Sequence, residues 1–285
     1  MIILDYSAIA MAAFFARGSS AEESMLRHFI LNSVRLHNVN HRDKYGKMVI
    51  ACDSRSWRKD AYPQYKANRK TGRDKSEVDW DAVFQTFTKV KEELKENFPY
   101  IVVTVDGAEA DDIIATLVKE TQEFGKNEPV MIISSDKDFV QLHRYGNVKQ
   151  YSPITKKFVT HEKPVEYLYE HIFKGDSSDG VPNVLSDDDT FVDMDKRQRP
   201  LSKKKIALWI DNINDLESVM TYDELRNYQR NKKVIDLNEI PDEVTNNIKQ
   251  EVKNSQPSKL AGSKVLNYLI QNRLNSLVES VQEFL

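Results

Sequence analysis

The chain has 285 residues, with 41 basic and 44 acidic side chains, a formal net charge of −3 and 40% hydrophobic residues. This composition is typical of an ordinary globular protein that can bury a sizeable core, and it excludes collagen-like and intrinsically disordered classes. The single cysteine excludes an intramolecular disulfide, and no uncharged run is long enough to span a bilayer, so we expect a monomeric cytoplasmic protein.

Four short apolar runs are predicted to be buried strands, and each is followed by acidic residues. The runs and their acids are residues 1–4 with Asp5, residues 48–52 with Asp53, residues 101–105 with Glu109, Asp111 and Asp112, and residues 130–135 with Asp136 and Asp138. The carboxyl ends of parallel strands meet at one edge of a sheet, where ligands bind. We therefore expect these acids to lie close together.

Helical patterns lie between and after these strands. Trp80, Val83, Phe84 and Phe87 follow the three-to-four spacing of an amphipathic helix. The predicted helices are 80–94, 113–121, 139–143, 164–173, 202–213, 222–231, 241–253 and 258–284, and the segments 148–151 and 157–159 are predicted to form a strand or hairpin. The alternation predicts an α/β fold with a mainly parallel central sheet flanked by helices, followed by an all-helical C-terminal lobe. We place the α/β domain at residues 1–180 and the lobe, for duplex or partner binding, at 181–285.

A basic segment follows the second strand, over residues 55–73. On a helix, Lys66 and Arg69 would share one face and could hold a phosphate, and the rings of Tyr62 and Tyr65 could stack on an exposed base. The alternative is a solvated charged loop. The nucleic-acid contacts predicted in this region are Arg58, Lys59, Tyr62, Tyr65, Lys66, Arg69 and Lys70.

The acidic groups predict a divalent-cation site rather than a set of helix caps. A single aspartate at a strand–helix junction usually caps the helix, but a cap needs only one carboxylate, and the third and fourth junctions offer several. Clustered carboxylates need neutralisation, and Mg²⁺ prefers oxygen ligands. The six histidines are scattered, which disfavours zinc. Two Mg²⁺ ions, with Mn²⁺ as a substitute, would suit phosphodiester hydrolysis.

Four ordered motifs resemble the 5′-nuclease family, which includes flap endonucleases and the 5′-nuclease domain of bacterial DNA polymerase I. They are Ala108-Glu109-Ala110-Asp111-Asp112, Ser135-Asp136-Lys137-Asp138, Gly175-Asp176-Ser177-Ser178-Asp179-Gly180 and Tyr62-Pro63-Gln64-Tyr65-Lys66-Ala67-Asn68-Arg69. Their order and spacing agree with the family over about residues 1–185. The match favours a functional role for the basic segment, as an arch over about residues 55–80.

The resemblance implies a metal-dependent 5′-to-3′ exonuclease and flap endonuclease that removes RNA primers from RNA–DNA hybrids and flaps from DNA during lagging-strand replication. The implied metal positions are Asp5, Asp53, Glu109, Asp112, Asp136, Asp138 and Asp179, with Asp111 and Asp176 acting through water. Lys66 and Arg69 would position the phosphate, and Asp112 and Asp136 count among the catalytic residues. A single-stranded-DNA-binding protein or a sliding clamp would be a partner, in the host cytoplasm if a phage encodes the chain.

The sequence departs from the family pattern after Pro182. The family's Gly-Ile-Gly-type turn is absent from Val181-Pro182-Asn183-Val184-Leu185, and Lys203, Lys204 and Lys205 are candidates for the phosphate contacts instead, although a solvated helix face would explain them equally well. Two other functions remain open at this point: a PIN-like endoribonuclease, and a non-catalytic protein that binds replication junctions.

Overall fold

The computed structural model of the chain describes residues 1–16, 22–69, 73, 76–123, 125–193, 195–255, 257 and 261–285. It divides into two compact units that are interleaved in sequence: residues 1–55, 78–160 and 242–285 form the first, and residues 56–77 and 161–241 form the second. Each unit is described separately below.

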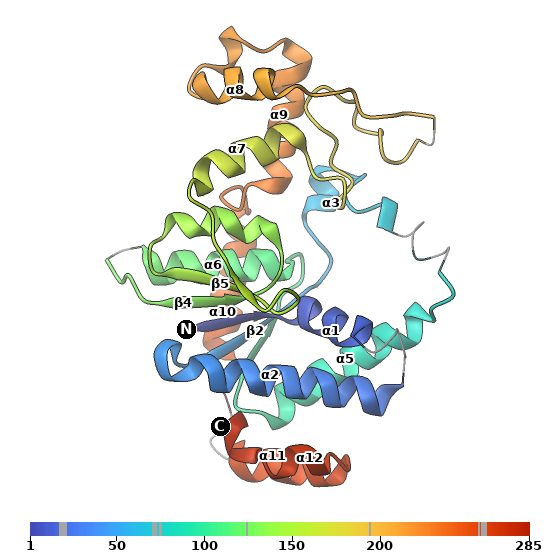
Figure 1. Cartoon of the computed structure of the whole chain (residues 1–285), viewed down its shortest axis with the longest axis vertical. Coiled ribbons are helices and arrows are strands. Elements are labelled where there is room, and N and C mark those ends of the chain that lie inside the picture. Colours follow the sequence, from blue (N-terminus) through green and yellow to red (C-terminus); the bar gives the residue numbers. More distant parts are fainter. Residues whose placement is uncertain are drawn as a thin grey trace. The chain divides into compact units, whose positions relative to one another are not determined.

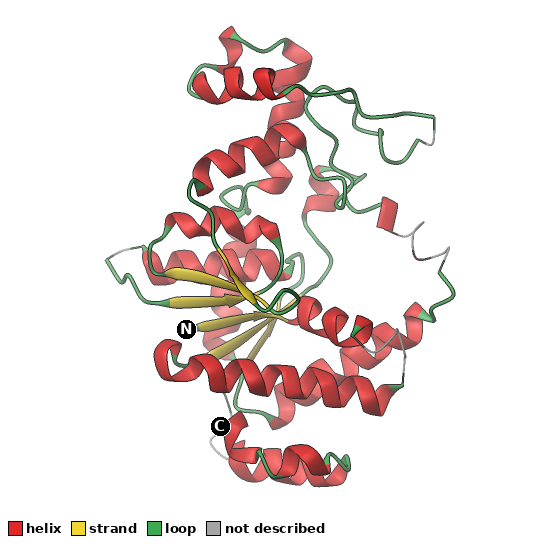
Figure 2. Ribbon diagram, in the orientation of Figure 1, coloured by secondary structure: helices red, strands yellow, loops and turns green. Residues whose placement is uncertain are grey.

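The first unit contains a six-stranded sheet in the order β3-β2-β1-β4-β5-β6 (Figures 1 and 2). The strands are β1 (Ile2–Asp5), β2 (Met48–Cys52), β3 (Ile101–Thr104), β4 (Val130–Ile133), β5 (Val148–Ser152) and β6 (Lys157–Val159). β1 to β5 pair in parallel and β6 joins β5 antiparallel, so the predicted mainly parallel sheet is confirmed.

The central strands β1, β2 and β4 are buried on both sides because helices cover both faces of this sheet. Ile2, Leu4 and Ile50 belong to a core shared with α1 (Tyr6–Phe15), α2 (Glu23–Tyr45) and α5 (Trp80–Asn97). α6 (Ala110–Gln122), the 3₁₀ helix η1 (Lys137–Arg144) and α10 (Asp242–Asn254) pack on the other side, as Figure 1 shows. α2 has no counterpart among the predicted ranges.

The end of the chain returns to the first unit instead of forming one long helix. Residues 258–284 were predicted as a single helix, and this is wrong for the described part, where α11 (Ala261–Gln271), α12 (Asn275–Val278) and the 3₁₀ helix η3 (Val281–Phe284) follow one another. Arg273 has a φ of 55°, and the Leu274 N–H bonds to the Leu269 carbonyl at 2.9 Å, which ends α11. Val265, Leu269 and Phe284 join the core of α2 and α5.

The second unit is helical. It consists of α3 (Arg58–Ala61), α7 (Pro164–Lys174), α8 (Lys203–Asp211), the 3₁₀ helix η2 (Leu216–Ser218) and α9 (Tyr222–Ile235), around Phe173, Trp209 and Tyr228. The division at residue 180 into a nuclease domain and a lobe for duplex or partner binding stays a prediction. Packing alone groups 181–241 with the second unit and 242–285 with the first. Among the described helices, none has the length and apolar character needed to cross a membrane.

Candidate functional site: strand-end carboxylates and a basic clasp

In the first unit, the carboxyl ends of three adjacent strands carry acids. Asp5 ends β1, Asp53 directly follows β2, and Asp136 follows β4, while β1 lies between β2 and β4. Asp5 is opposite Ala51 in the β1–β2 register, and Leu4 is opposite Ile133 in the β1–β4 register. From β1, the strands β2 and β3 are added successively on one side, and β4 is then added on the other side of β1. Ligands of parallel sheets bind at such a reversal of strand order.

Asp5 is the most deeply buried of these three acids, with 7% of its surface exposed. Its carboxylate accepts hydrogen bonds from the Ala8 N–H at 3.0 Å and from the Ser134 hydroxyl at 2.8 Å, neither of which carries a charge. Burial and the negative charges of Asp53 and Asp136 together raise the pKa of Asp5 to about 7, although the two hydrogen bonds act to lower it. The three carboxylates therefore repel one another, and a cation would relieve the repulsion.

The start of α6 brings a second group of acids to the same end of the sheet. Asp53 Oδ1 accepts from the Ala110 N–H at 2.8 Å, which joins the acid after β2 to the first turn of α6. Glu109 and Asp112 form a capping box, with the Glu109 N–H donating to Asp112 Oδ2 at 2.9 Å, and Asp111 is partly exposed beside them. Helix capping thus accounts for one role of Glu109 and Asp112, as expected for a strand–helix junction.

The turn after β4 supplies the third group. The Asp136 N–H donates to Ser134 Oγ at 3.1 Å, and Asp136 Oδ1 accepts from the Asp138 N–H at 2.9 Å. Asp136 is exposed and Asp138 is partly exposed. The side chains of Ser134 and Asp136 therefore bond to backbone N–H groups of the same turn, and the carboxylate of Asp136 is exposed to solvent.

The donor set of the first unit fits a hard divalent cation. All seven predicted ligands of this unit are carboxylates at the carboxyl ends of β1 to β4: Asp5, Asp53, Glu109, Asp111, Asp112, Asp136 and Asp138. Oxygen donors in a mixed buried and exposed setting suit Mg²⁺ or Mn²⁺, which bind through a few carboxylates and retain water. The pKa of Asp5 is raised first by burial and then by the negative charge of Asp53, which agrees with acids crowded at this end of the sheet.

In the second unit, two of the sequence motifs bind each other as a clasp, defined here as residues 62–69 with residues 176–180. The Lys66 N–H donates to the Asp179 carbonyl at 2.7 Å, and the Asn68 amide donates to the Ser177 carbonyl at 2.9 Å. Gly180 has a φ of +72°, and a side chain there would approach the Gln64 carbonyl to 3.1 Å, so the contact requires glycine.

In the clasp, Lys66 and Arg69, which were predicted to bind phosphate, both pair with Asp179, which was predicted to bind metal. Lys66 Nζ lies 3.5 Å from Asp179 Oδ2, Arg69 forms an ion pair with Asp179 Oδ1, and the Tyr65 hydroxyl donates to Asp179 Oδ2 at 3.0 Å. In the same loop, burial would raise the pKa of Asp176, but hydrogen bonds from His171 and Ser178 outweigh it and lower that pKa. The predicted metal roles of Asp176 and Asp179 stay predictions.

The other predicted nucleic-acid contacts fall into two groups. Tyr62, Tyr65 and Arg58 are buried, and Arg58 Nε donates to the Val234 carbonyl at 2.8 Å, so these side chains pack the second unit and are not available to stack on a base in this conformation. Residues 63–67 form turns and Lys66 has a φ of 58°, so the helix on which Lys66 and Arg69 were expected to share a face is not formed there. The stacking role of Tyr62 and Tyr65 stays a prediction.

Five other lysines complete the predicted contacts. Lys59, Lys203 and Lys204 are exposed, whereas Lys205 is partly exposed and forms an ion pair with Glu224. Lys70 lies outside the described residues. The role of these lysines in nucleic-acid binding stays a prediction, and Lys205 has a local partner within the second unit.

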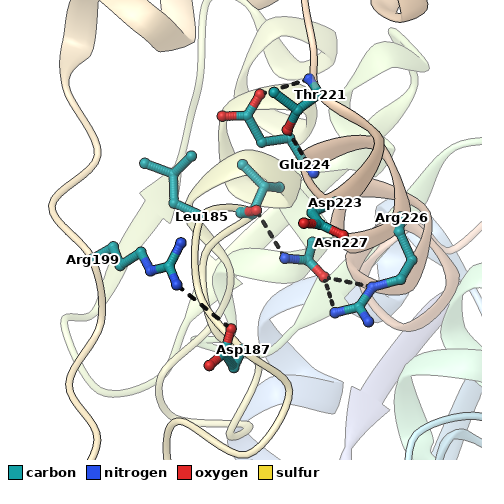
Figure 3. Close-up of a pocket in the computed structure, with 9 residues that line it drawn as sticks. Leu185, Asp187, Arg199, Thr221, Asp223, Glu224, Arg226 and Asn227 are labelled. Atoms are coloured by element: carbon teal, nitrogen blue, oxygen red, sulfur yellow. Dashed lines mark hydrogen bonds and ion pairs between the residues drawn. The ribbon is translucent and has the colours of Figure 1, made fainter.

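A separate polar pocket of about 270 Å³ lies in the second unit, as Figure 3 shows. Arg199 and Arg226 line it together with Asp187, Asp223 and Glu224, and Glu224 caps α9 with Thr221. Because the acids outnumber the arginines among these five charged side chains, the pocket lacks the positive charge expected of a phosphate site.

Two residues near the acids were not predicted, namely Ser134 and Gln150. Both are fully buried polar side chains. Gln150 lies between Val148 and Ser152 on the buried side of β5, and the sequence of this strand does not mark it as a functional position.

Comparisons with known proteins agree over the whole chain. Residues 1–170 match the family described as 5′-3′ exonuclease, N-terminal resolvase-like domain, and residues 164–284 match the family described as T4 RNase H, C terminal. A ribonuclease H of Enterobacteria phage T4 is 36% identical over 294 residues, covering 99% of this chain and 95% of that protein. A flap endonuclease Xni of Vibrio atlanticus is 31% identical over 137 residues, covering 46% of this chain and 49% of that protein.

Solved structures share the fold at lower identity. A phage T5 5′-exonuclease with bound zinc ions has a TM-score of 0.58 and 16% identity, covering 100% of this chain and 98% of that chain. A phage T5 flap endonuclease in a pseudo-enzyme–product complex with DNA and metal ions has a TM-score of 0.58 and 17% identity, covering 89% and 97%. At these identities the likeness supports the fold alone.

Proposed function

The chain belongs to the 5′-3′ exonuclease family of metal-dependent 5′ nucleases, and we propose that it uses Mg²⁺ to hydrolyse RNA–DNA hybrids and DNA flaps from the 5′ end. The observation that supports the choice of a divalent cation is that Asp5, Asp53 and Asp136 lie at the carboxyl ends of three adjacent strands, with the Asp5 carboxyl buried. The biological role that we propose is removal of RNA primers during lagging-strand replication, and the name ribonuclease H of the T4 relative supports the choice of RNA–DNA hybrids as substrates.

The proposed ligands are the seven carboxylates of the first unit, with Asp176 and Asp179 as further candidates. Two bound Mg²⁺ ions would supply Lewis acidity to the phosphate and lower the pKa of the attacking water. The chain's own contribution is to hold the carboxylates at fixed strand and helix ends, and Asp112 and Asp136 do this through bonds to neighbouring backbone N–H groups.

Lys66 and Arg69 are proposed to position the scissile phosphate after they exchange Asp179 for substrate. Both are paired with Asp179 in the described conformation, and about half of the Arg69 side chain remains exposed. A phosphate that accepts two hydrogen bonds from Arg69 can compete with the half-exposed Arg69–Asp179 ion pair, because exposed ion pairs contribute little net free energy in water. The predicted protein partners, a single-stranded-DNA-binding protein or a sliding clamp, and the monomeric state belong to the same proposal.

A cleavage assay tests the proposal. Flap, nicked, RNA–DNA hybrid and single-stranded substrates, each labelled at the 5′ end, are incubated with the protein in Mg²⁺, in Mn²⁺ and in EDTA. The expected result is release of short 5′ products from the hybrid and the flap with either metal, and none in EDTA. Cutting of unstructured RNA with no preference for 5′ ends would instead support the PIN-like endoribonuclease, and binding without cleavage the non-catalytic alternative.

A further inference from the structure

A buried polar network connects the fifth strand to the acids at the ends of β1 and β4. Gln150 lies on β5, opposite Ile132 of β4, and is fully buried. Its amide Nε2 donates to the Ser134 carbonyl at 2.9 Å and to the Asp136 carbonyl at 2.6 Å, and its Oε1 lies 3.0 Å from His143 Nε2. The amide therefore grips both ends of the three-residue turn that carries Asp136.

The orientation of the Gln150 amide follows from its partners. Both backbone carbonyls can only accept hydrogen bonds, so the NH₂ group must face them and the amide oxygen must face His143. With this orientation His143 Nε2 is the donor to Gln150 Oε1. Every polar atom of the Gln150 side chain has a partner, which is the condition under which a buried amide is stable.

Ser134 continues the network to the carboxylates themselves. It is fully buried, its hydroxyl donates to Asp5 Oδ2 at 2.8 Å, and the same oxygen accepts from the Asp136 N–H at 3.1 Å. One hydroxyl thus links the carboxylate at the end of β1 to the backbone of the acid after β4. A second hydroxyl contact joins the next residue to β5, with Ser135 Oγ and Ser152 Oγ 2.7 Å apart.

We infer that Ser134 and Gln150 are positioning residues for the metal site: the hydroxyl fixes the separation of Asp5 and Asp136, and the amide holds the turn that presents Asp136. The inference rests on the proposed function, because it gives these residues a role only if the acids bind metal. The geometry supplies a physical reason. Asp136 is exposed, and its backbone is held on both sides, with its N–H donating to Ser134 Oγ and its carbonyl accepting from Gln150 Nε2.

The buried position of Gln150 supports this assignment over a purely structural one. Val148 and Gln150 both point inward from β5, and an apolar residue in place of Gln150 would fill the same slot without the cost of burying an amide. The amide instead makes its hydrogen bonds to the backbone carbonyls of residues 134 and 136 and to the ring of His143. Groups that orient metal ligands in this way typically change metal affinity or activity by about 10- to 100-fold when removed.

The test compares Gln150→Met and Ser134→Ala with the matched control Asn38→Leu. Methionine keeps the volume of glutamine and lacks its donors, and alanine is small enough to fit at residue 134. Asn38 is also a buried amide of the first unit, and it donates to the Glu283 carbonyl at 3.0 Å, a contact with the C-terminal 3₁₀ helix. Asn38→Leu therefore removes a comparable buried hydrogen bond that does not involve the acids.

Mg²⁺ and Mn²⁺ binding to each full-length variant is measured by titration calorimetry, together with the increase in Tm that saturating Mg²⁺ produces. We expect Gln150→Met and Ser134→Ala each to weaken metal binding by about 10-fold or more, with kcat reduced and KM for the nucleic acid unchanged. The double variant is expected to lose less than the product of the two effects, because both side chains hold one turn. Asn38→Leu is expected to lower Tm without changing metal affinity.

Metal affinities equal to wild type in both variants would overturn the inference while leaving the proposed function intact. Parallel losses in all three variants would also overturn it, because they would show a general effect of destabilisation. Absence of metal binding by the wild-type protein would refute the proposed function itself. If Gln150→Met fails to fold, Ser134→Ala alone decides by the same metal titration.

Discussion

Removing the charge of Asp5 should stabilise the protein in the absence of metal. The ordinary pKa of this carboxyl is 3.8, and in the folded chain burial, together with Asp53 and Asp136, raises it to about 7. Below pH 3.8 the group is neutral in both the folded and the unfolded chain. Between pH 3.8 and 7 the folded chain retains a proton that the unfolded chain has released, so the free energy of unfolding falls as pH rises through this window.

The size of the effect follows from the two pKa values. Their difference corresponds to about 4 kcal/mol of unfolding free energy, fully lost above pH 7. Asp5→Asn is nearly isosteric, and its amide oxygen can still accept from the Ala8 N–H. In EDTA the variant should match the wild type near pH 4 and exceed it by up to about 4 kcal/mol at pH 8.

Urea denaturation at half-unit pH intervals measures the difference in unfolding free energy between the variant and the wild type. The titration of the other carboxylates contributes equally to both proteins and cancels in this difference. Adding Mg²⁺ should reverse the order at pH 8, since only the wild type gains the free energy of metal binding. An Asp5→Asn variant that is less stable than wild type by the same amount at pH 4 and pH 8 in EDTA would refute the reasoning. It would mean that Asp5 contributes through its hydrogen bonds, and that repulsion from Asp53 and Asp136 is negligible.

Four other outcomes follow from the site. Asp136→Asn is expected to slow cleavage roughly 100-fold or more, with nucleic-acid binding retained in a gel-shift assay. Lys66→Ala and Arg69→Ala should each lower kcat/KM by about 10- to 100-fold, and Lys66→Arg should restore part of the loss in the same assay if charge is what matters. Asp179→Asn in EDTA should tighten nucleic-acid binding, because it frees two cations, and fluorescence titration reporting weaker binding would contradict this. The log–log dependence of binding on salt should have a slope near −4 to −5 for about five phosphate contacts.

The sheet and the position of its acids could be predicted because both follow from local patterns. A four- or five-residue apolar run followed by an acid places that acid at the carboxyl end of a strand, and strands alternating with helices pair in parallel. Asp5, Asp53 and Asp136 are found where this argument puts them. The same patterns do not encode the order of the strands, so the burial of Asp5 beneath its neighbours required the structure.

The contacts of the basic segment could not be predicted, because they depend on a partner more than 100 residues away. Spacing grouped Lys66 and Arg69, and the structure shows that both pair with Asp179, while their predicted role in holding a phosphate stays a prediction. It did not show that Tyr62 and Tyr65 are buried, since a pattern of residue types does not show which side chains the rest of a unit will cover. The break at Arg273 was missed for a related reason, because arginine carries no warning of a positive φ.

Cap and ligand are not competing explanations for an acid at the start of a helix. Asp5, Asp112 and Asp136 each accept a backbone N–H through one carboxylate oxygen. A carboxylate has two oxygens with about four acceptor sites, so the bond that caps a helix leaves capacity for a cation and at the same time fixes the direction in which that capacity lies. Capping lowers the entropy that a ligand must lose on binding metal, and the N-terminal helix dipole partly offsets the repulsion among the anions. Junctions between strands and helices therefore favour metal sites for the same reason that they favour aspartate caps.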